Sequence, residues 1–311
     1  MSTIDPTVRV RVDKDGTREL SFVDDPIPRA IYNRFANTCV ETMNFLPIDA
    51  NDLRQLMVRA RLMKRDDNWN NSALDIFQAQ SIRRNVTHQY LISNAYIVKS
   101  HLPDIVREYD ANVSAIDIAH KWKHSPYFVF RHIIYIKYGN SGKADLARIS
   151  RGEIKASDAF NARDAHEYDT VEPFDYESAA VCDNIGIMAN AREKQFIALL
   201  RECGIDLMTQ ADLLARAAAE HTHPITPDAL FTTKVKINGI MSAWVDFKAY
   251  FGAPLPYLMR STIEQEAKYR TAFGPGFIAY EHGYVANLPY PAISVRGLRN
   301  KIEENVTSSV L

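Results

Sequence analysis

The clearest pattern of hydrophobic and polar positions lies in the C-terminal third of the chain. Residues 231–237 (FTTKVKI) alternate and are rich in β-branched side chains, and residues 240–251 (IMSAWVDFKAYF) form a second, more apolar run. Such runs predict two β-strands. Asn238 and Gly239 stand between them, and both residue types tolerate a positive φ. The pattern therefore predicts a β-hairpin with a two-residue turn.

Two charged residues interrupt the second run. Asp246 and Lys248 are two positions apart, so both project from one face of the predicted strand. A third charge lies before the hairpin, in Thr226-Pro227-Asp228. Simple pairing around the turn would place Asp228 beside Ala249, one position out of phase with Lys248. We expect a bulge, or a loop with an odd residue count, that brings the three charges onto one face. The alternative is a solvated strand face, although an unpaired Asp246 would be costly among apolar neighbours.

Helical patterns flank the hairpin. Residues 191–203 have a helical period that places Glu193 on the buried stripe, and the alternative is an ordinary first-turn glutamate favoured by the helix dipole. Residues 261–273 predict a second helix, on which Gln265 and Tyr269 share a face.

Several shorter signals complete the pattern. Thr262 and Gln265 match a helix capping box, which is an alternative role for Gln265. Residues 277–280 and 284–288 predict short strands that extend the sheet, and a small hairpin is expected around Asp15-Gly16.

The N-terminal half, from residue 27 to about 155, is helical in pattern. Residues 114–138 resemble a helix-turn-helix, with Ser125 as the cap and Pro126 as the first residue of the second helix. The basic residues in or near that second helix are candidates for phosphate contacts: Lys121, Lys123, Arg131 and Lys137. The alternative is a plain helical core or a surface that docks another protein.

Composition sets limits without identifying a function. The 311 residues are 46% hydrophobic and 24% charged, which is ordinary for a globular protein. No apolar run is long enough to span a membrane, and the first residues lack a secretory signal. Cys39, Cys182 and Cys203 lack metal-binding spacing, which indicates a reducing compartment. His221 and His223 lie in a Pro-containing segment, which we interpret as a solvated loop.

The net charge of −1 gives no support for nucleic-acid binding, but its distribution is uneven. Residues 117–155 hold eight Lys or Arg against three Asp or Glu, and residues 158–183 hold eight acidic residues against one Arg. A basic block is typical of a phosphate-binding face, and an acidic block of a linker or a partner surface. Two solvated faces are the alternative.

The three charges of the predicted hairpin suit metal-assisted phosphodiester cleavage. Asp228 and Asp246 offer hard oxygen ligands for Mg²⁺, and Lys248 is placed to orient a water or stabilise developing charge.

The order of these signals along the chain resembles the PD-(D/E)xK, or restriction-endonuclease-like, nucleases. More closely, the chain resembles the TPD family, and this resemblance is weaker over the rest of residues 27–288. The residues that carry it are Thr226-Pro227-Asp228, 244–249 (WVDFKA), Gln265, Tyr269, 273–276 (FGPG) and Gly283-Tyr284.

The resemblance implies a restriction-endonuclease-like fold and Mg²⁺ or Mn²⁺ as cofactor. It implies that Asp228 and Asp246, with the main-chain carbonyl of Phe247, bind the metal. Lys248 would be the catalytic lysine, with Glu193 and Gln265 as auxiliary groups. Tyr269 would lie near bound nucleic acid. It also implies a codanin-like protein partner and a location in the nucleus, the cytoplasm or both.

We therefore expect an α/β C-terminal domain of restriction-endonuclease type, preceded by an all-α domain. The predicted segments are an N-terminal extension (1–26), a helical domain (27–155), an acidic connection (156–190) and a nuclease-like domain (191–311). The expected function is metal-dependent cleavage of DNA or RNA, with the helical domain binding nucleic acid or the codanin-like partner. The alternative is a non-catalytic adaptor of the codanin-interacting type.

Overall fold

The structure is a computed structural model in which the chain divides into two compact units, each made of more than one segment. One, the sheet unit, comprises Met1–Arg34, Asp66–Ile82 and Ala189–Leu311, and the other, the helical unit, comprises Phe35–Arg65 and Arg83–Met188. The structure describes residues 8–22, 25–45, 48–65, 69, 72–175 and 178–295. Residues 156–188, expected as a connection, belong to the helical unit, while β1 and β2 from the N-terminus join the sheet unit.

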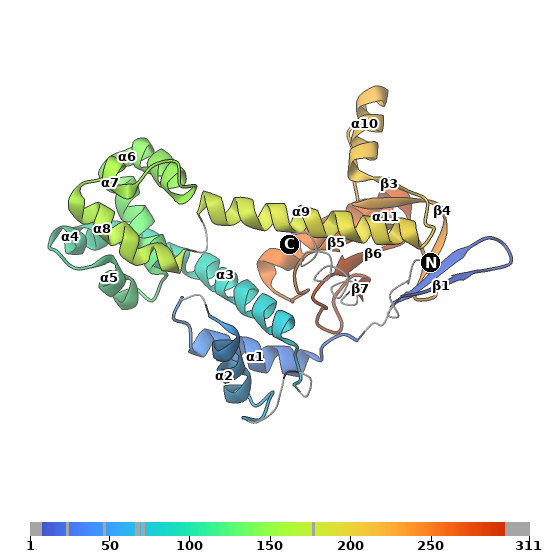
Figure 1. Cartoon of the computed structure of the whole chain (residues 1–311), viewed down its shortest axis with the longest axis horizontal. Coiled ribbons are helices and arrows are strands. Elements are labelled where there is room, and N and C mark those ends of the chain that lie inside the picture. The colour runs from blue at the N-terminus through green and yellow to red at the C-terminus, as the bar shows by residue number, and fades with distance from the viewer. Residues whose placement is uncertain are drawn as a thin grey trace, which may run out of the picture. The chain divides into compact units, whose positions relative to one another are not determined.

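A mixed β-sheet forms the centre of the sheet unit (Figure 1). Its strands are β1 (Val8–Val12), β2 (Arg18–Phe22), β3 (Leu207–Thr209), β4 (Ala229–Ile237), β5 (Ile240–Lys248), β6 (Gly276–Tyr280) and β7 (Ala292–Ser294). Their order is β1-β2-β4-β5-β6-β7, with β3 paired to β4. β1 with β2, and β4 with β5, are antiparallel hairpins, whereas β2 with β4, β5 with β6 and β6 with β7 are parallel. The predicted hairpins around Asp15-Gly16 and Asn238-Gly239 are confirmed.

Helices cover the two faces of the sheet. α9 (Ala179–Glu202) packs on the face that includes Val245 and Phe247, with Phe196 stacked on Phe247 at 5.2 Å between ring centroids. α11 (Pro256–Phe273) contributes Tyr269 to the opposite face, where the ring meets Trp244 edge-on at 5.1 Å. Because side chains alternate along a strand, Asp246 and Lys248 lie on the α11 face.

The closest contact in this sheet explains one glycine. Gly276 pairs with Trp244, and a Cβ at Gly276 would lie 2.3 Å from the Trp244 ring. The Trp244 indole N–H donates to the carbonyl of Gly274 at 2.9 Å. No other residue type fits at Gly276 without moving the tryptophan beside the site.

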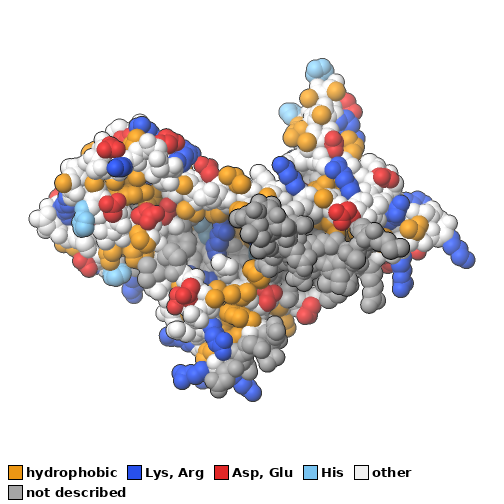
Figure 2. Space-filling view, viewed as in Figure 1, with side chains coloured by type: hydrophobic (Ala, Val, Ile, Leu, Met, Phe, Trp, Pro, Cys, Tyr) orange, Lys and Arg blue, Asp and Glu red, His pale blue; other side chains and the backbone are white. Residues whose placement is uncertain are grey.

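α10 (Gln210–Glu220) stands away from the sheet and packs mainly on β3 (Figure 1). Thr209 caps it in a capping box with Asp212. Figure 2 shows hydrophobic side chains interspersed with charged ones on its surface, and Leu214 is 46% exposed. His221 is its left-handed C-terminal cap, and both His221 and His223 are exposed, as the loop interpretation expected.

Four predicted boundaries are wrong. The helix expected at residues 191–203 is the C-terminal half of α9, which begins at Ala179, so Glu193 does not lie in a first turn and that alternative is excluded. The strand expected to reach residue 251 ends at Lys248, and the main-chain N–H of Phe251 donates to the Ser81 hydroxyl at 2.8 Å. Residues 284–288 form two isolated bridges instead of a strand, since Gly283 and Asn287 adopt positive φ and break the extended backbone. β7 extends the sheet instead.

The last correction concerns α11, which begins at Pro256 instead of 261. Proline suits the first helical position. Thr262 therefore lies inside the helix, where its hydroxyl donates to the carbonyl of Leu258 at 2.8 Å. The capping-box alternative for Gln265 is excluded.

The helical unit draws on helices of residues 35–65 and 83–188. Its elements are part of α1 (Arg29–Glu41), α2 (Ala50–Arg59), part of α3 (Ile76–Ser100), α4 (Leu102–Asp110), α5 (Ala115–Lys121), α6 (Pro126–Ser150), α7 (Ala156–Ala159), α8 (Ala162–Val171), η2 (Glu172–Phe174) and the start of α9. The acidic segment 158–183 is thus largely helical, and Ala165, Tyr168 and Val171 of α8 join the hydrophobic core of the unit.

The predicted helix–turn–helix order is present in α5 and α6. Ser114 caps α5 through the N–H of Asp117, and Pro126 is at the first turn of α6. Ser125 occupies the cap position of α6, but its hydroxyl donates to the carbonyl of Phe174 at 3.1 Å instead of accepting from the helix. In the described part of the chain, no helix combines the length and apolar character that crossing a bilayer requires.

Candidate functional site

The site begins with an irregularity in the β4–β5 hairpin. Asn238 and Gly239 have φ of 48° and 81°, and Ile237 pairs with Ile240 across the turn. Between Leu230 and Val235 the register shifts, so that Leu230 faces Trp244. Four residues of β4 then match one residue of β5.

This shift determines which charges meet. The pair Ala229 and Val245 continues the shifted register, and the next position places Asp228 opposite Asp246. Directly opposed residues in an antiparallel pair share a face. The expected irregularity is therefore confirmed, and it brings Asp228, Asp246 and Lys248 to the same face of the sheet.

Asp246 is a buried carboxylate with one close cation. Its residue is 1% exposed, and the Lys248 Nζ lies 2.5 Å from its Oδ2. Burial raises the pKa of Asp246 above its ordinary value, although the Lys248 ammonium opposes the shift. One ammonium does not compensate for the lost hydration of this carboxylate.

Lys248 is charged despite its own burial. Burial acts to lower its pKa, but the Asp246 carboxylate, helped by Tyr250, outweighs that effect and raises the pKa of Lys248. Its side chain is only 18% exposed. The lysine is therefore a fixed cation at the end of β5.

Asp228 is held by the main chain of the neighbouring strand. Its Oδ2 accepts a hydrogen bond from the N–H of Phe247 at 2.7 Å. Burial, with the charges of Asp246 and Glu193, raises the pKa of Asp228 from 3.8 to about 8. Without a bound cation, burial and the two neighbouring carboxylates favour the protonated form of Asp228.

A chain of hydrogen bonds connects Lys248 to the segment Thr226-Pro227-Asp228. The Lys248 Nζ donates to Gln265 Oε1 at 3.0 Å, and Gln265 Nε2 donates to the Tyr269 hydroxyl at 3.0 Å. The Tyr269 hydroxyl donates in turn to the carbonyl of Thr226 at 3.0 Å. Gln265 and Tyr269 of α11 thus hold both the Lys248 amine and the main chain at Thr226, two residues before Asp228. Tyr269 is 5% exposed, so it lies within the site and not on an open surface.

Glu193 approaches the same group from α9. It is half-buried, and burial followed by the charge of Asp246 raises its pKa. Three acidic groups therefore repel one another around one lysine. Glu193 also raises the pKa of Asp228, which indicates a common electrostatic field.

The donor set suits a hard divalent cation. The N–H and C=O of one strand residue point to the same side, so the Phe247 carbonyl lies on the edge occupied by Asp228. Asp228, Asp246 and this carbonyl supply oxygen ligands of the kind that Mg²⁺ and Mn²⁺ prefer. Across the described ranges, no three His, Cys, Asp or Glu side chains lie close enough together to hold a metal ion by themselves.

The basic residues proposed for nucleic-acid contact have varied surroundings. Lys121 forms an ion pair with Glu108 at 2.6 Å, and the guanidinium of Arg131 lies over the Phe128 ring at 5.0 Å. Lys123 is exposed.

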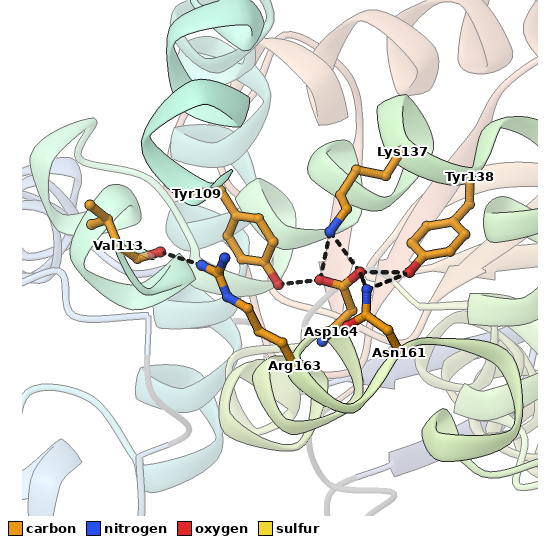
Figure 3. Close-up of polar contacts among 7 residues, drawn as sticks. All are labelled: Tyr109, Val113, Lys137, Tyr138, Asn161, Arg163 and Asp164. Carbon is orange, nitrogen blue, oxygen red and sulfur yellow. Dashed lines mark hydrogen bonds and ion pairs between the residues drawn. The ribbon is translucent and has the colours of Figure 1, made fainter. Parts of the chain in front are cut away.

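Lys137 forms an ion pair within the helical unit. Figure 3 shows its Nζ directed at the Asp164 carboxylate, at 2.9 and 2.7 Å from the two oxygens. The same carboxylate accepts from the hydroxyls of Tyr109 and Tyr138 and from Asn161 Nδ2. Asp164 is 0% exposed. Lys137 is therefore the counter-ion of a buried acid.

Sequence reasoning missed two charged residues beside the site. Glu281 follows the apolar strand β6 and is 1% exposed, and it forms an ion pair with Arg192 at 2.7 Å. A single acid after the apolar run GFIAY was a signal of the same kind as Asp246 in its own strand. The partner on α9 could not be read from the pattern.

Residues 157–298, somewhat less than half of the chain, match the family model described as "Protein of unknown function TPD sequence-motif". A stretch of 96 residues, 30% of this chain, is 30% identical to the "Uncharacterized protein L539" of Acanthamoeba polyphaga mimivirus. The match covers 34% of that viral protein, about a third of its length. No solved structure matches the chain.

Proposed function

We propose that this chain belongs to the TPD family and is a metal-dependent phosphodiesterase with a restriction-endonuclease-like sheet unit, acting on DNA or RNA. The register shift of the β4–β5 hairpin carries the proposal, because it sets Asp228 opposite Asp246 with Lys248 two residues further along. A purely structural hairpin has no need for two buried, mutually repelling acids. The flanking helices α9 and α11 each add a polar side chain to that group.

Each residue has a distinct role in the proposal. Asp228, Asp246 and the Phe247 carbonyl would hold Mg²⁺ or Mn²⁺, which would polarise the phosphate and lower the pKa of a bound water. Lys248 stabilises the negative charge that develops on the phosphate, or orients the attacking water. Gln265 fixes the lysine, and Glu193 adds negative potential at the edge of the site.

The burial of the group also favours catalysis. A fixed ammonium acts more strongly in a site with little water, because the local dielectric constant is lower. Lys248 is placed by contacts with both Asp246 and Gln265, so little reorganisation is needed when charge develops on a substrate.

Mn²⁺ titration by calorimetry tests the proposal, followed by incubation with labelled single-stranded, duplex and branched DNA and RNA. Wild type should bind Mn²⁺ and cleave at least one substrate, and Asp246→Asn should do neither. Glu264→Gln is the control, since Glu264 is 68% exposed on α11 in an ion pair with Arg260. A wild type that binds no Mn²⁺ and cleaves nothing refutes the proposal.

For the helical unit we propose a docking role, with a codanin-like protein as the partner. The ion pairs of Lys137 with Asp164 and of Lys121 with Glu108 disfavour phosphate binding by these two lysines, which leaves the protein partner implied by the family resemblance as the proposal. A Lys121→Ala/Lys123→Ala variant should leave the salt dependence of nucleic-acid binding unchanged. A clearly smaller salt dependence in this variant would instead assign the phosphate contacts to α5 and the turn that follows it.

A further inference from the structure

The charged pair of Arg192 and Glu281 lies next to the proposed site and has no role in it so far. Glu281 immediately follows β6, and its N–H donates to the carbonyl of Lys248 at 3.0 Å. Its main chain is thus joined to β5 at the residue that carries the catalytic amine. The side chain of Glu281 is 2% exposed.

The other end of the pair reaches α9. Arg192 Nη1 donates to Glu281 Oε1 at 2.7 Å, and the Arg192 side chain is 28% exposed. Arg192 directly precedes Glu193, whose charge acts on both Asp246 and Asp228. One ion pair therefore connects the turn of α9 that carries Glu193 to the strand end that carries Lys248.

The pair is poorly satisfied for a purely structural contact. Glu281 Oε2 is buried and accepts no hydrogen bond from the described residues, and His282 Nε2 lies 3.9 Å away. A buried acid with an oxygen left without a hydrogen bond is costly, so a core built for stability alone would replace it with an apolar side chain.

We infer that Arg192 and Glu281 are positioning residues that hold Glu193 of α9 against the Asp228–Asp246–Lys248 group. The pair sets the distance between α9 and the end of β5, and so the negative potential that a divalent cation meets. This inference rests on the proposed function. Neither residue touches the reacting atoms.

A second ion pair in the sheet unit, whose glutamate is also buried, provides the control. Glu266 and Arg270 are 3.1 Å apart within α11, and the Glu266 side chain is 8% exposed. That pair lies within one helix and joins no two elements. Glu281→Gln and Glu266→Gln therefore remove comparable charges, and only the first releases α9.

The first test needs no metal. Amide hydrogen exchange of residues 189–196 should be faster by about tenfold or more in Glu281→Gln than in wild type, because local opening of that turn costs less free energy. Glu266→Gln should leave it unchanged. Equal exchange in wild type and Glu281→Gln overturns the inference, whether or not the protein cleaves nucleic acid.

The second test is a double-mutant cycle for Mn²⁺ affinity. Glu193→Gln should weaken Mn²⁺ binding by about tenfold in wild type and have almost no effect in Glu281→Gln, where Glu193 is already displaced. Cleavage by Glu281→Gln should show a lower kcat with an unchanged KM. Full additivity of the two substitutions overturns the inference while leaving the nuclease proposal intact. Absence of Mn²⁺ binding and cleavage in wild type refutes the proposed function, and the exchange measurement then decides on the positioning role.

Discussion

Two buried aspartates, one in each unit, show how burial can serve opposite purposes. Asp164 is 0% exposed and Asp246 is 1% exposed, and each contacts a lysine at 2.7 Å or less. Burial acts to raise the pKa of Asp164, yet donors from Lys137, Tyr138 and Tyr109 lower it below the ordinary value. The pKa of Asp246 is raised, because Lys248 and the nearby Tyr269 hydroxyl do not offset its burial.

The difference separates a structural acid from a candidate site. Asp164 has its charge and its hydrogen bonds satisfied by the protein (Figure 3), so it gains little from any further ligand. Asp246 repels the neighbouring acids Asp228 and Glu193. An added cation would relieve that repulsion. A buried carboxylate whose charge is not fully balanced by hydrogen-bond donors and cations is therefore a better guide to a functional site than burial alone.

The largest expected effect is the loss of cleavage on removing the site lysine. Lys248→Ala should lower the cleavage rate by at least about 10³-fold, because a buried, fixed cation is removed from the charge that develops on the phosphate. Initial rates on labelled substrates measure this. Lys234→Ala is the control, since Lys234 is 68% exposed on β4. Equal losses in both variants would contradict the special role of Lys248.

Removing the charge of Asp164 should destabilise the helical unit without changing the proposed metal site. Asp164→Asn should lower the free energy of unfolding of the helical unit by about 3–5 kcal/mol, because Lys137 loses its buried partner. Urea unfolding measures the loss, with Mn²⁺ affinity unchanged. Asp145→Asn, which breaks a surface pair with Arg148, should cost at most about 1 kcal/mol. If Asp164→Asn lowers the free energy of unfolding no more than Asp145→Asn does, the hydrogen-bond network around Asp164 does not stabilise the helical unit.

The two units should also respond oppositely to pH in the absence of metal. Asp228 binds its proton more tightly in the folded protein than in the unfolded chain, because its pKa is raised on folding. The stability that this protonated carboxyl group contributes is therefore fully present below pH 3.8 and is lost as the pH rises through about 8. The contribution of Asp164, with its lowered pKa, is present above 3.8 and is lost as the pH falls.

Urea unfolding in a chelator between about pH 5 and 8.5 tests this prediction. Wild type should lose at least about 1 kcal/mol over that range, because each unit of pKa shift corresponds to about 1.4 kcal/mol. Asp228→Asn should flatten the dependence. An identical slope in the variant would exclude Asp228 as its source.

The smallest expected effect concerns the hydrogen-bond chain. Tyr269→Phe removes the hydroxyl that connects Gln265 with the Thr226 carbonyl, and should reduce cleavage about tenfold at a stability cost of about 1 kcal/mol. Steady-state kinetics and thermal unfolding measure both. Tyr96→Phe, at a residue 68% exposed, should change neither. Unchanged kinetics in Tyr269→Phe would show that Gln265 holds Lys248 without help.

The hairpin shows what the sequence could predict about the site. Alternation and parity indicated that Asp228 needed an odd displacement to meet Asp246. The size of the shift could not be predicted, because it depends on β3: Phe231 pairs with Leu207, and the N–H of Thr232 donates to the Asp206 carbonyl at 2.9 Å. Those partners lie on a separate element, and a local pattern does not contain them.

The same limit applies to the helical unit. Periodicity predicted its helices, since each buries one apolar stripe. The partner of Lys137 is a residue of a different helix, α8, and a basic residue on a helix has no sequence signature that distinguishes an internal ion pair from a phosphate contact. Glu281 could have been found by the argument already used for Asp246, but its partner Arg192 could not.

The pairing of β2 with β4 has a consequence for how this protein folds while it is being synthesised. Leu20 lies opposite Ile237, so the β1–β2 hairpin leaves the ribosome long before the strand that pairs with it, β4, has been synthesised. The helical unit is completed in the meantime. Until β4 arrives, one edge of the hairpin has no partner and is open to pairing with other chains. A shortened chain that starts at residue 191 would create the reverse problem, with β4 exposed and its partner missing.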